Sequence, residues 1–323
     1  MKCLRCGAET PTESIPLCPE CSREDEEIFM KLHQNLELLG GDDCNLCSNR
    51  CSLREGHGIC GIPRRGRESA ILHAYYDPLP TNCCNSWFCK GSELRGFNLA
   101  IFYYGCNFDC LFCQNWEHKL VHRGEEKDIE SLLQMIHEDV RCICHFGGSP
   151  EPQLPFAIEF SRRAVEETSE LMICWEWNGA GRKDLVLRAA ELSYESGGTV
   201  KFDLKAWSRG LHRILTGRDN ERVLENFRAV AEEFPEVISA TTLLVPYYVD
   251  EIEVEGISRF IAEINDEIPY SLLVFHPDYR MRDLPVTPVE QVRKCYEAAR
   301  KHLKNVHIGN LHLIYGILRE KFY

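Results

Sequence analysis

The segment GCNFDCLFCQNW occupies residues 105–116, directly after an apolar, strand-like run at 98–105. Its three cysteines, Cys106, Cys110 and Cys113, have the spacing C-x3-C-x2-C. Three thiolates on one short loop can bind three irons of a [4Fe–4S] cube and leave the fourth iron without a protein ligand. Clusters that only transfer electrons normally have four cysteine ligands, so the open iron predicts that a substrate or cofactor binds there. A zinc loop and a chance spacing in a cysteine-rich chain are the alternatives for the same three cysteines.

Strand-like runs continue after this loop and alternate with helical patterns. Residues 129–136 and 257–264 each carry apolar side chains at positions i, i+3, i+4 and i+7, the spacing of a buried helix face. Strands separated by helices predict βαβ units and a parallel sheet. The six strand-like runs lie at residues 98–105, 142–148, 171–179, 199–207, 237–246 and 270–278.

Six such units predict an α/β fold with a partial (β/α)6 TIM-like barrel, in which the chemistry lies at the carboxyl ends of the strands. A doubly wound sheet is the alternative, because periodicity does not distinguish the two. The last helix is expected to begin at Thr287-Pro288-Val289-Glu290, a capping box with proline at the first helical position. The loop 105–116 follows the first strand, where a barrel enzyme places active-site residues.

Composition excludes several classes of function. The 323 residues are 44% hydrophobic and 27% charged, as in a soluble globular protein. The net charge of -13 disfavours a nucleic-acid partner, which usually requires a basic face. No apolar run approaches the roughly 18 residues of a membrane helix, and the N-terminus has no apolar signal core. We therefore expect a cytoplasmic protein without a membrane partner.

The 18 cysteines of the chain are concentrated toward its N-terminus, with eleven before residue 90. A disulfide framework is not expected in a long chain without a secretion signal, so this density predicts metal binding. The composition divides the chain into three regions. We expect a zinc-ribbon-like module at 1–40, a cysteine-rich region that binds metal or a cluster at 41–97, and the barrel core at 98–323.

Two sets of four cysteines precede the barrel. The first, the N-terminal thiol set, consists of two C-x2-C knuckles that match the closed tetrahedral coordination of structural zinc; a rubredoxin-like iron is the alternative. The second set suits zinc and an auxiliary iron–sulfur cluster equally, and four protein ligands make it structural or electron-relaying. The first set is Cys3, Cys6, Cys18 and Cys21, and the second is Cys44, Cys47, Cys51 and Cys60.

Seven cysteines lie outside these sets and outside the loop 105–116. For Cys83, Cys84 and Cys89 three interpretations stay open: ligands of a further cluster, completion of the second set, or packing thiols. The other four fall in strand or helix patterns, and we interpret them as buried thiols that behave as small hydrophobic side chains. These four are Cys142, Cys144, Cys174 and Cys295.

The C-x3-C-x2-C loop resembles the cluster motif of the radical S-adenosylmethionine (SAM) superfamily. The resemblance implies that Cys106, Cys110 and Cys113 bind a [4Fe–4S] cluster whose open iron chelates SAM, and that Phe112 packs near the SAM adenine. It further implies reductive cleavage of SAM to a 5'-deoxyadenosyl radical that abstracts hydrogen from a substrate. An electron donor such as flavodoxin or ferredoxin would supply the electron.

Three strand ends downstream resemble SAM-binding segments of the same superfamily. The segment HFGGSPE at 145–151 resembles its glycine-rich motif, which implies that Gly147 and Gly148 receive the SAM amino group. The segments WEWNG at 175–179 and FDLK at 202–205 resemble two signatures of the pyruvate formate-lyase activase branch. They add three implied SAM contacts, which are Asn178, Asp203 and Lys205.

Further segments resemble the radical SAM protein of the AmmeMemoRadiSam system. They are VPYYVD at 245–250, FHPDY at 275–279 and CQNW at 113–116. His276 stands where activase relatives use a histidine near SAM, so the resemblance implies a cofactor contact for it. The activase branch suggests a protein or peptide as the substrate.

Two other functions compete with this hypothesis. A metal-binding electron-transfer or interaction protein would use fully ligated clusters without SAM. The Asp203–Lys205 pair and the glycine turn, both at predicted strand ends, favour the enzyme. A radical SAM methylase would use a further cofactor, and the sequence has no recognisable cobalamin-type domain or second SAM fold.

Overall fold

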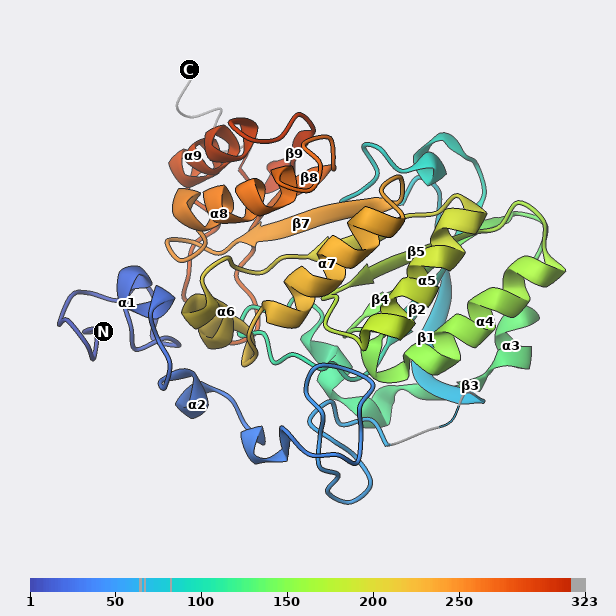
Figure 1. Ribbon diagram of the computed structural model, residues 1–323, viewed down its shortest axis with the longest axis horizontal. Helices are drawn as coiled ribbons and strands as arrows, with labels where there is room; N and C mark the ends of the chain where they lie inside the picture. Colours follow the sequence, from blue (N-terminus) through green and yellow to red (C-terminus); the bar gives the residue numbers. More distant parts are fainter. Residues whose placement is uncertain (64–65, 67, 82, 315–323) are drawn as a thin grey trace.

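A computed structural model describes residues 1–63, 66, 68–81 and 83–314 of the chain. Its centre is a nine-stranded sheet with the order β3-β1-β2-β4-β5-β6-β7-β8-β9. Strands β2 and β4 to β9 run parallel, whereas β1 is antiparallel to both β2 and β3. The edge strands β3 and β9 do not pair with each other within the described residues, so the sheet is an open, partial barrel (Figure 1).

Helices alternate with the parallel strands, and α4, α5 and α7 cover one face of the sheet (Figure 1). Within the described part of the chain, no helix has both the length and the apolar composition needed to cross a membrane. The strands are β1 (Ser69–Pro78), β2 (Phe97–Tyr103), β3 (Glu125–Asp128), β4 (Val140–Gly147), β5 (Met172–Trp177), β6 (Val200–Asp203), β7 (Ile238–Leu244), β8 (Tyr270–Val274) and β9 (Val306–Gly309). The helices are α1 (Pro19–Arg23), α2 (Phe29–Leu32), α3 (Ile129–Leu133), α4 (Leu154–Glu167), α5 (Lys183–Ser196), α6 (Arg209–Thr216), α7 (Glu221–Glu233), α8 (Glu251–Ala262) and α9 (Val289–Arg300).

The six predicted strands are confirmed as β2 and β4 to β8. They follow one another across the sheet in chain order, which excludes the doubly wound alternative, whose strand order reverses at a switch point. Three strands were not predicted. Strand β3 is charged and mostly exposed, and β9 has only four half-buried residues, so neither carries a clear apolar pattern. Residues 69–78 lie in the predicted cysteine-rich region but form β1, which pairs with β2 along seven residues.

The predicted capping box at the start of α9 is wrong. The helix begins at Val289, and its first amide groups receive no side-chain cap. The hydroxyl of Thr287 instead accepts a hydrogen bond from Phe275 N (2.7 Å) and donates one to Leu244 O (2.8 Å). Because Thr287 is fully buried, its hydroxyl satisfies backbone groups that follow β8 and end β7, and it is not available to the helix.

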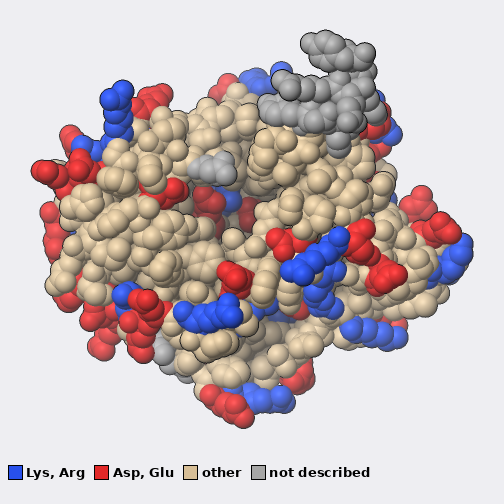
Figure 2. Space-filling model, turned by 180° about the vertical axis from the view of Figure 1, so that it is seen from behind, with Lys and Arg blue, Asp and Glu red and all other residues tan. Residues whose placement is uncertain are grey.

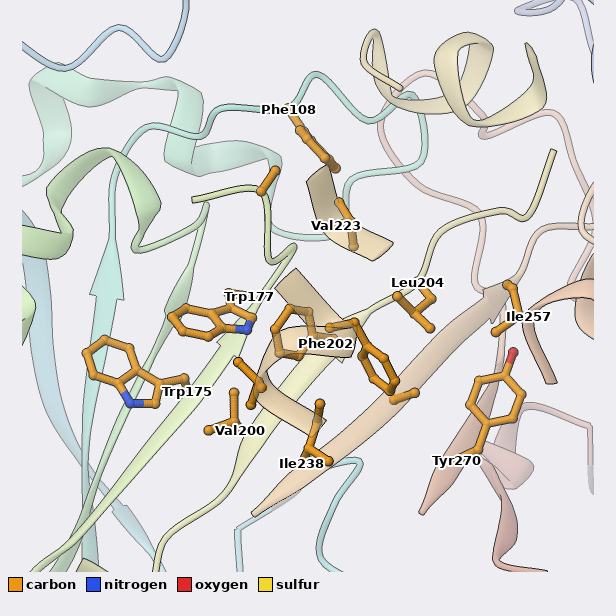
Figure 3. Packing of buried hydrophobic residues seen from close by; sticks show 14 of the residues in the cluster. Phe108, Trp175, Trp177, Val200, Phe202, Leu204, Val223, Ile238, Ile257 and Tyr270 are labelled. Carbon is orange, nitrogen blue, oxygen red and sulfur yellow. The ribbon is translucent and has the colours of Figure 1, made fainter. Parts of the chain in front are cut away.

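Strands β5 and β6 direct their side chains into two different environments. Trp175 and Trp177 stack with ring centroids 5.4 Å apart, and Phe202 meets the second indole edge-on at 5.6 Å (Figure 3). These rings are buried in the apolar core between the sheet and the helices. Alternation along a strand places Glu176 and Lys201 on the opposite, concave side of the sheet. That side holds the functional site.

The N-terminal region packs against the barrel through both α1 and the cysteine-rich segment. The guanidinium of Arg23 in α1 pairs with Asp250 and with Glu253 of α8, the latter at 3.1 Å, and α1 also lies beside α6 (Figure 1). Further along, Asn49 Nδ2 donates a hydrogen bond to Asn107 O (2.8 Å). The second contact places the cysteine-rich segment against the loop 105–116.

Candidate active site

A cavity of about 700 Å³ lies on the concave side of the sheet, against the loop 105–116, which we call the cluster loop. Figure 2 shows the molecule from behind, with a hollow near its centre in which acidic and basic side chains are visible. The cavity brings together nine of the predicted site residues, from four different strand ends. They are Cys106, Cys110, Phe112, Cys113, Gly147, Gly148, Asn178, Asp203 and Lys205.

The cluster loop is fastened to the barrel and to the N-terminal region through Asp109. Its backbone N–H donates to Thr216 O at the end of α6 (2.8 Å). Its carboxylate accepts hydrogen bonds from Lys119 Nζ (2.6 Å) and from His33 Nδ1 (2.9 Å). Burial raises the pKa of Asp109, but these two partners outweigh it and the pKa lies below its ordinary value. The loop is therefore held by a charged carboxylate that links three parts of the chain.

The three thiols of the cluster loop fit a multinuclear cluster. Burial raises the pKa of all three, that of Cys110 to about 12, so metal binding must displace their protons. Phe108 N donates to Cys106 Sγ (3.3 Å), a contact that supports thiolate ligands of iron–sulfur clusters. The thiols are not among the described groups whose ligand atoms converge within 4.8 Å. That spread is expected where each sulfur binds a different iron, and it is not expected of one zinc ion.

The glycine turn after β4 lies directly against the cluster loop. Gly148 N donates to Tyr103 O (2.9 Å), and Ser149 N donates to Gly105 O (3.2 Å). A Cβ atom on Gly148 would lie 2.1 Å from Gly105 O, and Gly147 has φ +112, which favours glycine. The two glycines thus allow the turn to touch the cluster loop itself, in addition to lining the cavity.

A buried amide and carboxyl network joins the third strand end to this turn. Asn178 Nδ2 donates to Asn107 Oδ1 (2.6 Å) and to Ser149 Oγ (2.9 Å). Glu151 Oε1 accepts from Gly179 N (2.7 Å), and its other oxygen accepts from the Ser149 hydroxyl. Burial raises the pKa of Glu151 to about 7. The network fixes Asn178 next to the thiol-bearing loop.

Asp203, the last residue of β6, and Lys205, two residues beyond it, form an ion pair inside the cavity. Lys205 Nζ donates to Asp203 Oδ2 (2.7 Å) and lies 5.8 Å from the centroid of the Phe112 ring. Lys201 Nζ is 3.4 Å from the other oxygen of Asp203. Burial raises the pKa of Asp203, but Lys201 and Lys205 together bring it below its ordinary value. The cavity therefore holds charged groups of both signs, which suit the carboxylate and ammonium of an amino-acid ligand.

The remaining predicted site residues lie elsewhere. His276 is exposed and is not among the residues that line the cavity. The four ligand atoms of the N-terminal thiol set lie within 4.8 Å of one another, as one metal ion requires, with Cys6 and Cys18 Sγ 3.6 Å apart. The second set, between Cys44 and Cys60, is not among the described groups that converge in this way.

Several cavity residues were not identified from the sequence. Glu176 and Lys201 alternate with apolar neighbours on β5 and β6, so strand periodicity could have found them. His118 had no such signal; its buried Nδ1 has no hydrogen-bond partner among the described residues, and burial lowers its pKa to about 3. Three of the four thiols interpreted as packing residues also line the cavity, namely Cys142, Cys144 and Cys174.

Comparisons with known proteins agree with this geometry. Residues 100–261, half of the chain, match the family model described as "Radical SAM superfamily". Uncharacterized protein MJ0808 of Methanocaldococcus jannaschii is 27% identical over 83% of this chain and 81% of its own length. The isethionate sulfite-lyase activating enzyme of Desulfovibrio desulfuricans is 32% identical over 53% of this chain and 55% of its own length. Other relatives are named as activating enzymes of pyruvate formate-lyase or of glycyl-radical enzymes.

One solved structure with a similar fold is that of Streptococcus suis SuiB bound to precursor peptide SuiA. It has a TM-score of 0.52 and 15% sequence identity over 69% of this chain and 51% of that chain. The family match and the relatives confirm the predicted superfamily and its activase branch. The open sheet confirms the predicted partial barrel.

Proposed function

The chain belongs to the radical SAM superfamily, and on that premise we propose that it binds SAM in the cavity beside the cluster loop and abstracts hydrogen from a protein or peptide substrate. Membership makes it an enzyme that cleaves SAM with a [4Fe–4S] cluster. The observation that carries the proposal is the meeting of three features in one cavity: the cluster-loop thiols, the glycine turn and the Asp203–Lys205 pair.

Different residues of the chain would bind the cluster and SAM. Cys106, Cys110 and Cys113 would bind three irons, and the Asp109 contacts keep their loop in place. When bound, the cluster and SAM together supply a carbon radical able to abstract hydrogen. Lys205 and Asp203 offer a cation and an anion to the amino-acid end of SAM.

Other residues of the cavity wall, and the volume of the cavity, also suit a bound SAM molecule. Phe112 lies at the cavity wall below the Lys205 ammonium and presents an apolar face suited to a nucleobase. The imidazole of His118 lies at the cavity wall, and burial lowers its pKa to about 3, so the ring is neutral near pH 7. The cavity volume lies within the range of pockets that bind small ligands.

A protein or peptide substrate is supported by the names of the relatives. The activating enzymes act on other enzymes, such as isethionate sulfite-lyase and pyruvate formate-lyase. For this chain we propose an extended segment of a protein as the substrate, with the reducing electron delivered by a protein such as flavodoxin or ferredoxin. We also propose that the N-terminal thiol set binds zinc. The chain would then consist of three regions, 1–40, 41–97 and 98–323.

An anaerobic cleavage assay tests the proposal. The protein would be reconstituted with iron and sulfide, reduced and given SAM, and 5'-deoxyadenosine would be measured. We expect cleavage by the native chain and none by the variant with Cys106→Ala, Cys110→Ala and Cys113→Ala. The matched control is Cys295→Ala, a buried thiol of α9 outside the cavity, which should retain activity. An intact, reduced cluster that neither binds nor cleaves SAM, with or without peptide, would favour an electron-transfer protein.

A further inference from the structure

The cavity contains a second group of metal-ligand side chains, which we call the cavity group: Cys83, Cys84 and Glu176. Their ligand atoms lie within 4.8 Å of one another, and Cys83 Sγ is 2.9 Å from Glu176 Oε1. The two cysteines lie between β1 and β2, whereas Glu176 is on β5, so the fold brings them together across the barrel. All three line the cavity that the cluster loop borders.

The segment that carries the two thiols is anchored at the amino-terminal end of the barrel. Asn85 Nδ2 donates to Ser239 Oγ near the start of β7 (3.0 Å), and Trp87 Nε1 donates to Ser271 Oγ near the start of β8 (2.9 Å). Asn85 is 1% exposed, so this anchor is part of the packed interior. The cluster loop follows the opposite, carboxyl end of β2. The segment therefore enters the cavity from the end opposite the cluster loop, and its thiols meet Glu176, the second-last residue of β5.

Each ligand atom of the cavity group has a polar neighbour that orients it, as metal ligands in proteins usually do. A backbone N–H donates to the thiol of Cys83, and a hydroxyl lies beside the thiol of Cys84. An ammonium donates to one carboxylate oxygen of Glu176, and the other oxygen faces Cys83. The three contacts are Asn85 N to Cys83 Sγ (3.3 Å), Thr241 Oγ1 to Cys84 Sγ (3.5 Å) and Lys201 Nζ to Glu176 Oε2 (2.8 Å).

The charge of the group matches a divalent cation. Two thiolates and one carboxylate carry three negative charges, which a divalent ion and the Lys201 ammonium neutralise. Sulfur and carboxylate ligands are those that zinc and ferrous iron accept. We propose that the cavity group binds a divalent thiophilic cation, zinc or ferrous iron. Three protein ligands leave one tetrahedral position for a molecule in the cavity, as in catalytic zinc sites.

Cobalt binding tests this site without SAM chemistry. The full chain with Cys106→Ala, Cys110→Ala and Cys113→Ala serves as background, so that no catalytic cluster forms. It would be stripped of metal anaerobically, loaded with Co²⁺ and dialysed. We expect the background to retain one more equivalent of cobalt than the same chain with Cys83→Ser and Cys84→Ser, and to show stronger thiolate-to-cobalt charge-transfer absorption. Because this assay involves neither SAM nor a reductant, its failure leaves the proposed function untouched.

Further variants keep the test decisive if the double serine change impairs folding. Cys142→Ser alters another thiol of the same cavity, whose sulfur donates to Asn98 Oδ1 (3.4 Å), and should retain all the cobalt. Lys201→Met removes only the ammonium and should weaken cobalt binding roughly 10- to 100-fold at unchanged stoichiometry. Equal cobalt content in the background and the Cys83→Ser, Cys84→Ser chain, with unchanged affinity in Lys201→Met, would overturn the proposal. Competition between Zn²⁺ and Fe²⁺ for the cobalt-loaded site then identifies the preferred ion.

Discussion

Single residues set the pH response of this protein, and Glu151 is the clearest case. Its carboxyl is fully buried, and burial raises its pKa from 4.5 to about 7. The folded protein thus holds this proton more tightly than the unfolded chain does. The stability it contributes is complete below pH 4.5 and is lost as pH rises through about 7, by roughly 3 kcal/mol.

We expect Glu151→Gln to flatten that part of the pH dependence. Urea unfolding of the native chain and the variant between pH 5 and 8 should give free energies that converge at the acid end and separate at the alkaline end. Glu236→Gln, at an exposed position, is the control and should run parallel to the native curve. Parallel curves for Glu151→Gln as well would show that this carboxyl does not titrate in that range.

Lys205 is the residue on which SAM affinity should depend most directly. Replacing it by Met removes a charge-assisted hydrogen-bond donor from the cavity, a loss of about 1.5–3 kcal/mol. Calorimetric titration of the reconstituted protein should show a dissociation constant for SAM raised roughly 10- to 100-fold. Lys183→Met, on the exposed start of α5, should bind SAM like the native chain. An unchanged constant for the Lys205 variant would remove this residue from the binding site.

Sequence motifs and strand periodicity predict some of the cavity residues but not others. Asp203 and Lys205 were predictable because the segment FDLK at 202–205 resembles a signature of the activase branch. Lys201 lies two residues before Asp203 on β6, so strand alternation alone places both side chains on one side of the sheet. His276 resembles a family position but is exposed, two residues beyond the end of β8. His118 is notable because its buried Nδ1 has no hydrogen-bond partner in the described part of the chain, a property that no local sequence pattern indicates.

Among the elements, the glycine turn and the cluster loop depend on each other. Gly148→Ala would place a methyl group 2.1 Å from Gly105 O and against the His118 ring, so one backbone segment must move. We expect a loss of about 1–3 kcal/mol of stability and poorer iron incorporation. Thermal unfolding and iron content after reconstitution measure the two effects. Gly66→Ala is the control, because an added methyl there meets no atom of the described residues within 4 Å.

Elements with strong apolar periodicity were predicted correctly, and weakly patterned ones were not. Strands β4 to β8 are mostly buried, so buried apolar side chains recur along them and mark each strand in the sequence. Strand β1 was missed because Ser69–Pro78 mixes polar and aromatic residues within a cysteine-rich region, and its place beside β2 depends on pairing distant in sequence. The capping prediction for Thr287 is wrong because the local pattern contains no information on distant backbone groups. The hydroxyl hydrogen-bonds Phe275 N and Leu244 O, which lie at the ends of two strands.

For the whole molecule, the N-terminal region and the barrel should act as one stability unit. The N-terminal thiol set draws its module together, and His33 then reaches Asp109 of the cluster loop. We expect Cys6→Ser with Cys21→Ser to lose one metal equivalent and to speed hydrogen exchange at the Asp109 amide about tenfold or more. Leu4→Ser, at an exposed site of the same module, should change neither. Unchanged exchange at Asp109 in the double variant would show that the module and the loop are uncoupled.

The two converging ligand groups differ in how far apart their members lie along the chain. The N-terminal thiol set spans only residues 3–21, whereas Cys83 and Glu176 are 93 residues apart. During synthesis the first group is complete long before the barrel strands exist, so a nascent chain can capture an ion there as it emerges. The second group is assembled only once β5 has joined the sheet. An ion would therefore bind the cavity group only after this part of the sheet has folded. The folded protein, and not the nascent chain, would then select the ion.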